Sequence, residues 1–295
     1  MASPMSCSKR IISKIFKKPG HPLSLSFCRY SHVKKSVAEI FGKSITDTPN
    51  IHIQGWVRSV REHKNVIFIH ITDGSCSSPV QVVVDPKLCG SDVTYGSCIS
   101  VRGTLIESPS SGQPYELQAS KVDVLGFCDP VQYPFKVKKR HSSDYTRNFP
   151  HLRPRTNFMS ALMRVRSSAT MAMHKFFQDN GYCYVHTPIL TSNDCEGAGE
   201  VFVVEPEKSE IVDEIKDSDD ESTSHNFFGT PAFLTVSGQL HLEAVTGAFT
   251  KVYNFGPTFR AENSRGRHHL SEFYMVEAEI AFTETLEDIM KVFIC

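Results

Sequence analysis

The stretch Phe259–Phe273, FRAENSRGRHHLSEF, crowds charged side chains between two segments that alternate like β-strands, 251–262 and 273–282. Alternation with a period of two is typical of a strand with one buried face. We therefore predict a hairpin with an apolar core face and an opposite face that meets solvent or a ligand. The expected core face is Tyr253, Phe255, Pro257, Phe259, Ala261, Tyr274, Val276, Ala278, Ile280 and Phe282. The opposite face is Asn254, Thr258, Arg260, Glu262, Phe273, Glu277 and Glu279.

The hairpin and its loop offer three kinds of recognition group. Cations suit a polyphosphate, an aromatic ring suits a purine face, and a carboxylate suits an exocyclic amine. This combination favours ATP, although the sequence has no glycine-rich GxxxxGK[ST] loop of the P-loop type. The alternative interpretation is a charged surface hairpin that merely faces solvent.

Residues 50–129 read as five short strands separated by turns that contain Gly, Ser, Asp or Pro. Five strands in so short a segment predict a small closed barrel, for which the OB-fold is the commonest topology. Within it, Phe68 and Gln81 are expected to point outward, a ring for stacking beside an amide for reading a base edge. The alternative is that Phe68 lies under a loop. With the mixed elements that follow, the fold class is α+β.

Charge and composition indicate the character of three further segments, residues 1–38, 131–156 and 205–224. The formal net charge is zero, but residues 1–38 hold eight Lys/Arg and no acid, which is typical of a mitochondrial transit peptide or a disordered basic tail. Residues 131–156 form a basic hinge that either contacts a phosphate backbone or is a solvated linker. Residues 205–224, with nine acids, predict a disordered insert.

A helix is predicted over 157–180, with Gly181 as its C-terminal stop. Its apolar residues recur every three or four positions, which predicts a buried stripe: Leu162, Val165, Ala169, Ala172 and Phe176. No stretch approaches the roughly 20 apolar residues of a membrane span. The nine cysteines show no CxxC spacing, so we predict neither a metal site nor a disulfide framework.

Together these motifs resemble the class II aminoacyl-tRNA synthetases. Phe-Arg-x-Glu, a basic loop and His-Leu-x-Glu-Phe look like motif 2 of that family, and GYCYVHTPIL (181–190) looks like motif 1, which builds the dimer interface. A barrel in front of them resembles the subgroup that charges aspartate, asparagine and lysine. The resemblance covers about residues 45–295, with the catalytic part over 157–295, and the basic start points to the mitochondrial form.

The resemblance implies roles for individual residues. Arg260 would hold the α-phosphate of ATP and stabilise the charge that develops as the adenylate forms. The remaining ATP contacts would be Glu262, Arg267, His268, His269 and Phe273, with His268 standing where asparagine-specific members often carry arginine. The amino acid would meet Glu196, Ser237, Gln239, Glu243 and Glu277. The anticodon would meet Arg58, Phe68, Gln81 and Glu116.

The substrate amino acid is predicted from two neighbouring residues. Aspartate-specific members usually have a lysine where this chain has Leu242, and Glu243 follows it. A glutamate accepts a hydrogen bond from a carboxamide NH₂ and repels a carboxylate, which favours asparagine over aspartate. A structural ion pair of Glu243 is the alternative.

The resemblance further implies ATP, Mg²⁺ with ligands beyond the end of this chain, asparagine and tRNA(Asn) as partners, a homodimer through motif 1, and the mitochondrial matrix. The chain is expected to stop before motif 3. Three rivals stay open: an aspartate-specific ligase, a truncated non-catalytic tRNA-binding isoform, and an ammonia-using asparagine synthetase, against which the barrel argues.

Overall fold

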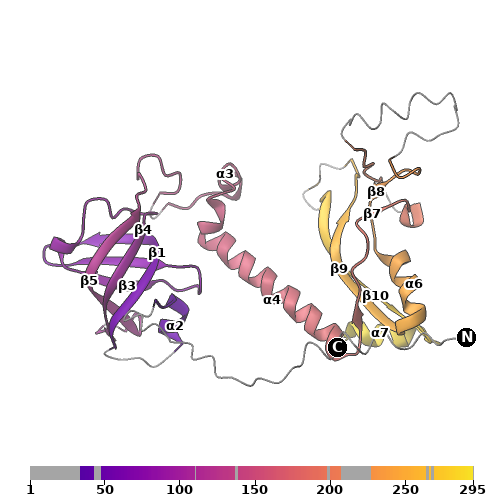
Figure 1. Cartoon of the computed structure of the whole chain (residues 1–295), viewed down its shortest axis with the longest axis horizontal. Helices are drawn as coiled ribbons and strands as arrows, with labels where there is room; N and C mark the ends of the chain where they lie inside the picture. The colour runs from indigo at the N-terminus through magenta and orange to yellow at the C-terminus, as the bar shows by residue number, and fades with distance from the viewer. Residues whose placement is uncertain are drawn as a thin grey trace, which may run out of the picture. The chain divides into compact units, whose positions relative to one another are not determined.

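The computed structural model describes residues 34–42, 48–109, 111–136, 139–197, 200–206, 227–263, 266 and 269–294. The chain divides into two compact units, Met1–Ala161 and Leu162–Cys295 (Figure 1). Over the described residues, no helix has the length and apolar character needed to cross a bilayer.

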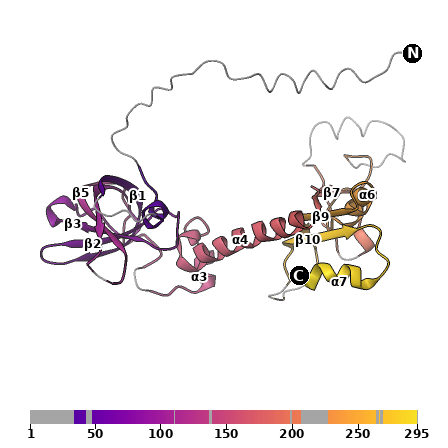
Figure 2. The ribbon, with the colours of Figure 1, turned by 90° about the horizontal axis from the view of Figure 1, so that it is seen from below.

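The first unit is built on a closed barrel with the strand order β1-β2-β3-β5-β4 (Figure 2). Its strands are β1 (Thr48–Glu62), β2 (Ile67–Thr72), β3 (Val80–Val84), β4 (Cys98–Glu107) and β5 (Tyr115–Gly126). All neighbouring pairs are antiparallel except β3 and β5, which run parallel. The predicted five-stranded barrel is confirmed.

Alternation decides which side chains enter the barrel. On β2, Ile67, Ile69 and Ile71 are buried while the residues between them are partly exposed. On β3, burial follows the same period, with Val80, Val82 and Val84 inside and Gln81 outside. The β-branched side chains thus fill the interior, and the outward residues form a surface whose order is fixed by strand register.

A short N-terminal segment completes the barrel core. Helix α2 (Val37–Phe41) begins with a capping box between Ser36 and Glu39 and buries Val37 and Ile40 completely. Asp73 and Ser75 accept hydrogen bonds from its first backbone N–H groups, at 2.8 and 2.9 Å. Residues 34–38 of the predicted leader are therefore packed structure, because two apolar side chains of this segment belong to the barrel core. Residues 1–33 lie outside the described part.

The basic hinge is more ordered than a solvated linker. Phe135 is buried, and its ring contacts His141, Tyr145 and Phe149. Around this aromatic cluster lie the short helix α3 (Ser143–Arg147) and the 3₁₀ turn η2 (Arg153–Arg155). Three cations of the hinge, Arg147, Arg153 and Arg155, consequently lie on these short helical elements.

Helix α4 (Asn157–Asp179) ends one residue before the predicted end, and the predicted stop, Gly181, has a φ of 80° that favours glycine. The predicted buried stripe is wrong for most of its length. Leu162 and Val165 are 45% and 66% exposed, Ala169 and Ala172 are exposed, and only Phe176 is partly buried. Periodicity shows that a helix has an apolar face, whereas burial needs a second surface. Within the described residues, α4 buries Met159 near its start, the guanidinium of Arg166 lies over the ring of Tyr274, and near the C-terminal end Phe177 stacks on Tyr253.

The second unit has a three-stranded sheet in the order β10-β9-β6, and a small pair β7-β8. The strands are β6 (Cys183–Tyr184), β7 (Leu190–Thr191), β8 (Phe233–Leu234), β9 (Lys251–Phe259) and β10 (Glu272–Ile280). Helices α6 (Gln239–Phe249) and α7 (Leu286–Ile294) lie on opposite sides of the β9–β10 hairpin (Figure 2). The 3₁₀ turn η3 (Cys195–Gly197) precedes the predicted acidic insert, most of which lies outside the described residues.

The hairpin exists as predicted, but the burial of its faces is not the predicted one. On the expected core face Tyr253 is buried, whereas Tyr274 and Val276 are 50% and 38% exposed. On the opposite face Asn254 and Thr258 are buried, at 4% and 2% exposed. Asn254 is buried because α6 and the segment 185–189 pack over this part of the polar face, so its amide meets Thr187 and Glu277 instead of solvent.

Candidate active site and nucleic-acid face

The hairpin places a cation over an aromatic ring at its loop end. The guanidinium of Arg260 lies 5.5 Å from the ring centroid of Phe273, on the same face of the sheet as Glu277. Arg260 follows β9 directly and its backbone N–H donates to Ser271. A guanidinium stacked on a ring keeps its donor edges free for a phosphate, and the ring offers a face for a base.

The two flanking candidates pair with each other. Nδ1 of His269 lies 3.2 Å from a carboxylate oxygen of Glu262, and both side chains are exposed. Arg267 and His268, predicted to contact ATP, lie outside the described residues. The structure thus brings Arg260 and Phe273 together, and separately Glu262 and His269.

Glu277 is the centre of a polar network at the other end of this face. Its carboxylate accepts hydrogen bonds from the hydroxyl of Ser237, from the backbone N–H of Gly238 at 2.8 Å and from the side-chain amide of Asn254 at 3.2 Å. The bond from Gly238 caps α6, which has no side-chain cap of its own. A carboxylate offers about four lone-pair positions, so one remains for a further donor such as an ammonium group.

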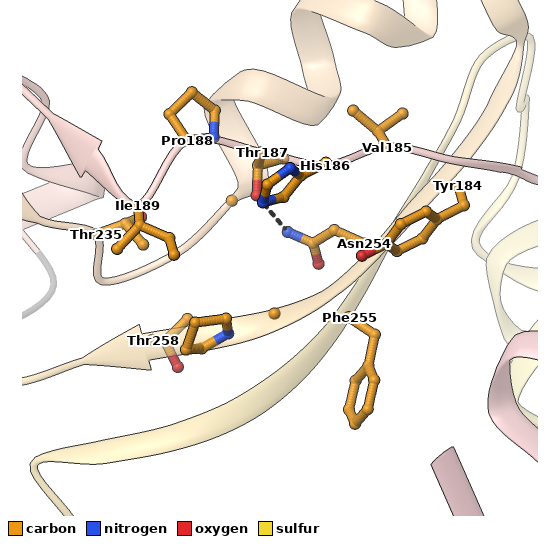
Figure 3. Close-up of a pocket in the computed structure, with 13 residues that line it drawn as sticks. Tyr184, Val185, His186, Thr187, Pro188, Ile189, Thr235, Asn254, Phe255 and Thr258 are labelled. Carbon is orange, nitrogen blue, oxygen red and sulfur yellow. Dashed lines mark hydrogen bonds between the residues drawn. The ribbon is translucent and has the colours of Figure 1, made fainter. Parts of the chain in front are cut away.

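Asn254 connects this network to the motif 1 segment. Its Nδ2 also donates to the hydroxyl of Thr187 at 3.1 Å, and the two side chains point toward each other in Figure 3. Close packing demands glycine at position 238, because a Cβ there would lie 2.0 Å from Asn254 Nδ2. The same side chains line an enclosed cavity of ≈ 20 Å³ between segment 184–189 and β9. That volume is about one water, far below the several hundred Å³ of a ligand pocket, so we take the partly exposed Glu277, and not this cavity, as the centre of the candidate site.

The residues predicted to choose the amino acid lie beside it on α6. Gln239 Nε2 donates to Glu243 at 3.1 Å, one helical turn further on. Leu242 is completely buried beneath them and presents nothing to the site. Burial raises the pKa of Glu279, and the nearby charges of Glu243 and Glu277 raise it further. Three carboxylates therefore share a small region, which opposes the entry of a fourth.

Glu196, predicted to contact the amino acid, belongs to η3, and its side chain lies outside the described part. Over that part, no group of three or more His, Cys, Asp or Glu side chains is arranged to hold a metal ion.

The anticodon candidates separate into two groups on the barrel. Phe68 and Gln81 point outward from β2 and β3, and Gln81 Nε2 donates to Glu116 at 3.2 Å. Glu116 is only 6% exposed, so its carboxylate orients the amide of Gln81 rather than offering itself to a base. Arg58 lies elsewhere, because its guanidinium donates to the backbone of Arg155 and the side chain of Asn157. It ties the hinge and the start of α4 to β1.

Sequence reasoning missed several members of these networks. Alternation placed Asn254 on the polar face of the hairpin but assigned it no contact, and Thr187 gives no local signal, because a threonine before a proline is an ordinary residue. Glu279 had a signal, since it lies two positions after Glu277 and hence on the same face. On the barrel, His70 lies two positions after Phe68, so the alternation of β2 places both side chains on the same outward face.

Comparison with known proteins agrees with both halves of this description. Residues 142–294 match the family described as "tRNA synthetases class II (D, K and N)", and residues 51–125 match the "OB-fold nucleic acid binding domain". The asparaginyl-tRNA synthetase of Homo sapiens is 51% identical over 259 residues, which are 88% of this chain and 52% of that protein. The asparagine--tRNA ligase of Geobacter metallireducens is 47% identical over 245 residues, covering 81% and 52% of the two chains. The chain therefore spans about half the length of the curated relatives it matches.

Solved structures show the same likeness. The crystal structure of asparaginyl-tRNA synthetase from Pyrococcus horikoshii, complexed with asparaginyl-adenylate, superposes with a TM-score of 0.72 at 27% identity, over 88% of this chain and 55% of that one. The asparaginyl-tRNA synthetase of Entamoeba histolytica, at 22% identity and a TM-score of 0.69, shares the fold. With a family match over just over half of its length, the chain belongs to the class II tRNA synthetases of the D, K and N group.

Proposed function

We propose that this chain carries the anticodon-binding part and the amino-acid- and ATP-binding core of an asparagine--tRNA ligase. The network of Ser237, Gly238 and Asn254 around Glu277, with Gln239 and Glu243 beside it, is the observation that carries the proposal. The names of the relatives at 47–52% identity support asparagine as the amino acid. The aspartate-specific alternative is disfavoured by the buried Leu242 and the three neighbouring carboxylates.

In the proposed reaction the carboxylate of asparagine attacks the α-phosphorus of ATP and displaces pyrophosphate. The protein needs no nucleophile, because positioning and charge neutralisation lower the barrier. Arg260 balances negative charge on the α-phosphate, Phe273 holds the adenine, and the remaining acceptor position of Glu277 takes the substrate ammonium. Glu243 accepts from the carboxamide of asparagine. The terminal adenosine of the tRNA then takes the acyl group. Mg²⁺ would accompany ATP and balance the charge of its phosphates.

The direct test is the binding of non-hydrolysable adenylate analogues to the full chain. By calorimetry we expect the asparaginyl sulfamoyl-adenosine to bind more tightly than the aspartyl form, by a factor on the order of 10² or more. Glu243→Gln should reduce that preference, and Arg260→Ala should weaken both analogues alike. Equal affinity of the wild type for the two analogues would exclude the asparagine assignment.

A non-catalytic tRNA-binding chain is the second candidate, because the five-stranded barrel is closed and carries the outward Phe68 and Gln81. Aminoacylation of tRNA(Asn) separates the two. The assay compares this chain with a chain extended at its C-terminus by the corresponding part of the human relative. Charging by the extended chain alone supports the ligase core, and no charging by either supports the accessory role.

We further propose that two copies of the chain associate through motif 1 (181–190) and the helix α4 that precedes it. The exposed apolar side chains on this helix, including Leu162, Val165 and Met171, support such a partner. Sedimentation equilibrium should show a dimer that Val165→Glu shifts toward monomer. A monomer in the wild type at micromolar concentration would contradict this proposal.

A mitochondrial location rests on the acid-free basic composition of residues 1–33, which carry six Lys/Arg. Fusion of these residues to a fluorescent protein should direct it to the matrix. Reversal of Lys14, Lys17 and Lys18 to glutamate should abolish import. A cytosolic signal from the unaltered fusion would remove the mitochondrial assignment and leave the ligase proposal intact.

A further inference from the structure

A row of polar side chains crosses four adjacent strands on the outside of the barrel. Ser59 on β1 is the register partner of His70 on β2, His70 of Gln81 on β3, and Gln81 of Glu116 on β5. Side chains at directly opposed positions stand about 5 Å apart, so the row is continuous. Phe68 lies two residues before His70 on β2, so the two side chains stand about 7 Å apart on the same face of the strand.

Two hydrogen bonds fix the row at its ends. Ser59 Oγ lies 2.7 Å from Nδ1 of His70, and Gln81 Nε2 donates to the buried Glu116. His70 and Gln81, in the middle of the row, therefore each use one polar side-chain atom in a hydrogen bond within the protein and have a second polar atom for another partner. The remaining atoms are Nε2 of His70 and Oε1 of Gln81, neither of which has a hydrogen-bond partner among the described residues.

The charge state of His70 decides what kind of contact it can make. Partial burial lowers the pKa of His70, and the nearby guanidinium of Arg61 lowers it further, so the ring is neutral at neutral pH. A neutral imidazole is a poor partner for a phosphate but a good one for a base edge. Its Nε2 donates when Ser59 donates to Nδ1, and it accepts when the serine accepts.

We propose that His70, oriented by Ser59, is a base-reading residue that contacts an RNA base edge beside the one contacted by Gln81. The inference rests on the proposed function, because it assigns a further specificity-determining residue to the anticodon-binding face. Phe68 supplies the stacking surface, and the row of His70 and Gln81 supplies directional contacts to neighbouring unstacked bases. The ligand class is a single-stranded RNA loop.

The test measures RNA affinity and base discrimination together. The full chain is titrated with a stem-loop RNA that carries the anticodon GUU, and with stem-loops in which each loop base is replaced in turn, at several salt concentrations. Loss of one neutral hydrogen bond predicts that His70→Ala weakens GUU binding about three- to tenfold and reduces discrimination at one loop position. The salt dependence should stay that of the wild type, because no phosphate contact is lost.

Three variants make the result interpretable. His70→Gln keeps hydrogen-bonding capacity and should recover part of the affinity, and Ser59→Ala should lose discrimination to a smaller extent. The matched control is His52→Ala, which removes a similar pair, His52 Nε2 to Ser100 Oγ at 2.9 Å, from the β1–β4 side of the barrel. It should change neither affinity nor discrimination. Thermal melts followed by circular dichroism verify that each variant is folded.

Two outcomes overturn the inference alone. One is a folded His70→Ala chain with wild-type affinity and discrimination at every loop position. The other is a uniform loss for all RNAs with a salt slope reduced by about 0.7, the signature of a phosphate contact. A wild-type chain that shows no preference among the stem-loops overturns the proposed anticodon function, and with it this inference.

Discussion

The barrel and the β9–β10 hairpin are both built from strands with alternating apolar residues, yet they bury them differently. On β2 and β3 every inward residue is buried, with Ile69 and Val82 completely so. On the hairpin the alternation is equally regular, but Tyr274 is half exposed and Asn254 on the polar face is buried. The barrel closes on itself and thereby defines its own inside. An open sheet has two faces, and the elements packed on them decide which is buried.

The largest expected difference is in the cost of truncating one apolar side chain. Ile69→Ala should destabilise the first unit by ~2–5 kcal/mol, because the closed core cannot collapse onto the gap. Val276→Ala, on the exposed apolar face, should cost less than ~1 kcal/mol. Denaturant unfolding is followed for the first unit by fluorescence of Trp56, the single tryptophan, and for the second by circular dichroism. Equal losses for the two variants would refute the contrast.

The second prediction concerns the buried polar face. Gly238→Ala should destabilise the second unit by ~1–3 kcal/mol, because the added methyl group would displace Asn254 from Glu277. On the same helix a methyl group added at Gly247 would meet nothing within 4 Å, so Gly247→Ala should stabilise by ~0.5–1 kcal/mol. Thermal melts compare the two. A tolerated alanine at 238 would mean that Asn254 is not fixed there.

The third prediction tests whether the N-terminal segment belongs to the barrel. Burial alone would raise the pKa of Asp73, but hydrogen bonds from Ser75 and from the backbone of Val37 outweigh it and lower the pKa. The stabilisation is therefore present above the unfolded-state pKa of about 3.9 and is lost as pH falls through the lower folded-state value. Asp73→Asn should cost ~1 kcal/mol at neutral pH.

Stability of the first unit against pH, measured by Trp56 fluorescence, checks this. The Asp73→Asn chain should lose less stability than the wild type between about pH 4 and pH 2. The exposed Asp92→Asn serves as the control and should follow the wild type. If all three curves coincide, Asp73 does not anchor α2.

The smallest effect is expected from the carboxylates beside α6. The pKa of Glu279 is raised by burial and then by Glu243 and Glu277, so its folded state prefers the proton. The stability of the second unit should accordingly fall as pH rises from about 4.3 through the folded-state pKa. Glu279→Gln should remove that fall and raise the midpoint of thermal unfolding slightly at neutral pH. Glu272→Gln, exposed on the same strand, should leave it unchanged.

These contrasts explain which features could be predicted from sequence. Period-two patterns located the five barrel strands and the outward Phe68 and Gln81, because closure makes local alternation sufficient. The helix after the hinge was located by its period and by Gly181. Its burial was not predictable, since Leu162 and Val165 look the same whether or not another surface covers them.

Some residues of the candidate site could likewise be predicted from the sequence, and others could not. The resemblance to the family indicated Arg260, Phe273 and Glu277, and the structure places all three on one face. It did not reveal Asn254 and Thr187, which depend on a contact across 67 residues of chain. It also could not separate Arg58 from the base-binding group, because the attachment of Arg58 to Asn157 exists only in the folded chain.

One carboxylate, that of Glu277, closes the first turn of α6 and also stands in the proposed substrate site. A substrate ammonium that binds Glu277 forms a hydrogen bond that is lost when the first turn of α6 opens. Substrate binding and the opening of this turn are therefore thermodynamically linked. Ligand would therefore slow deuterium uptake at the Gly238 amide, a reporter that senses substrate without any chemical turnover.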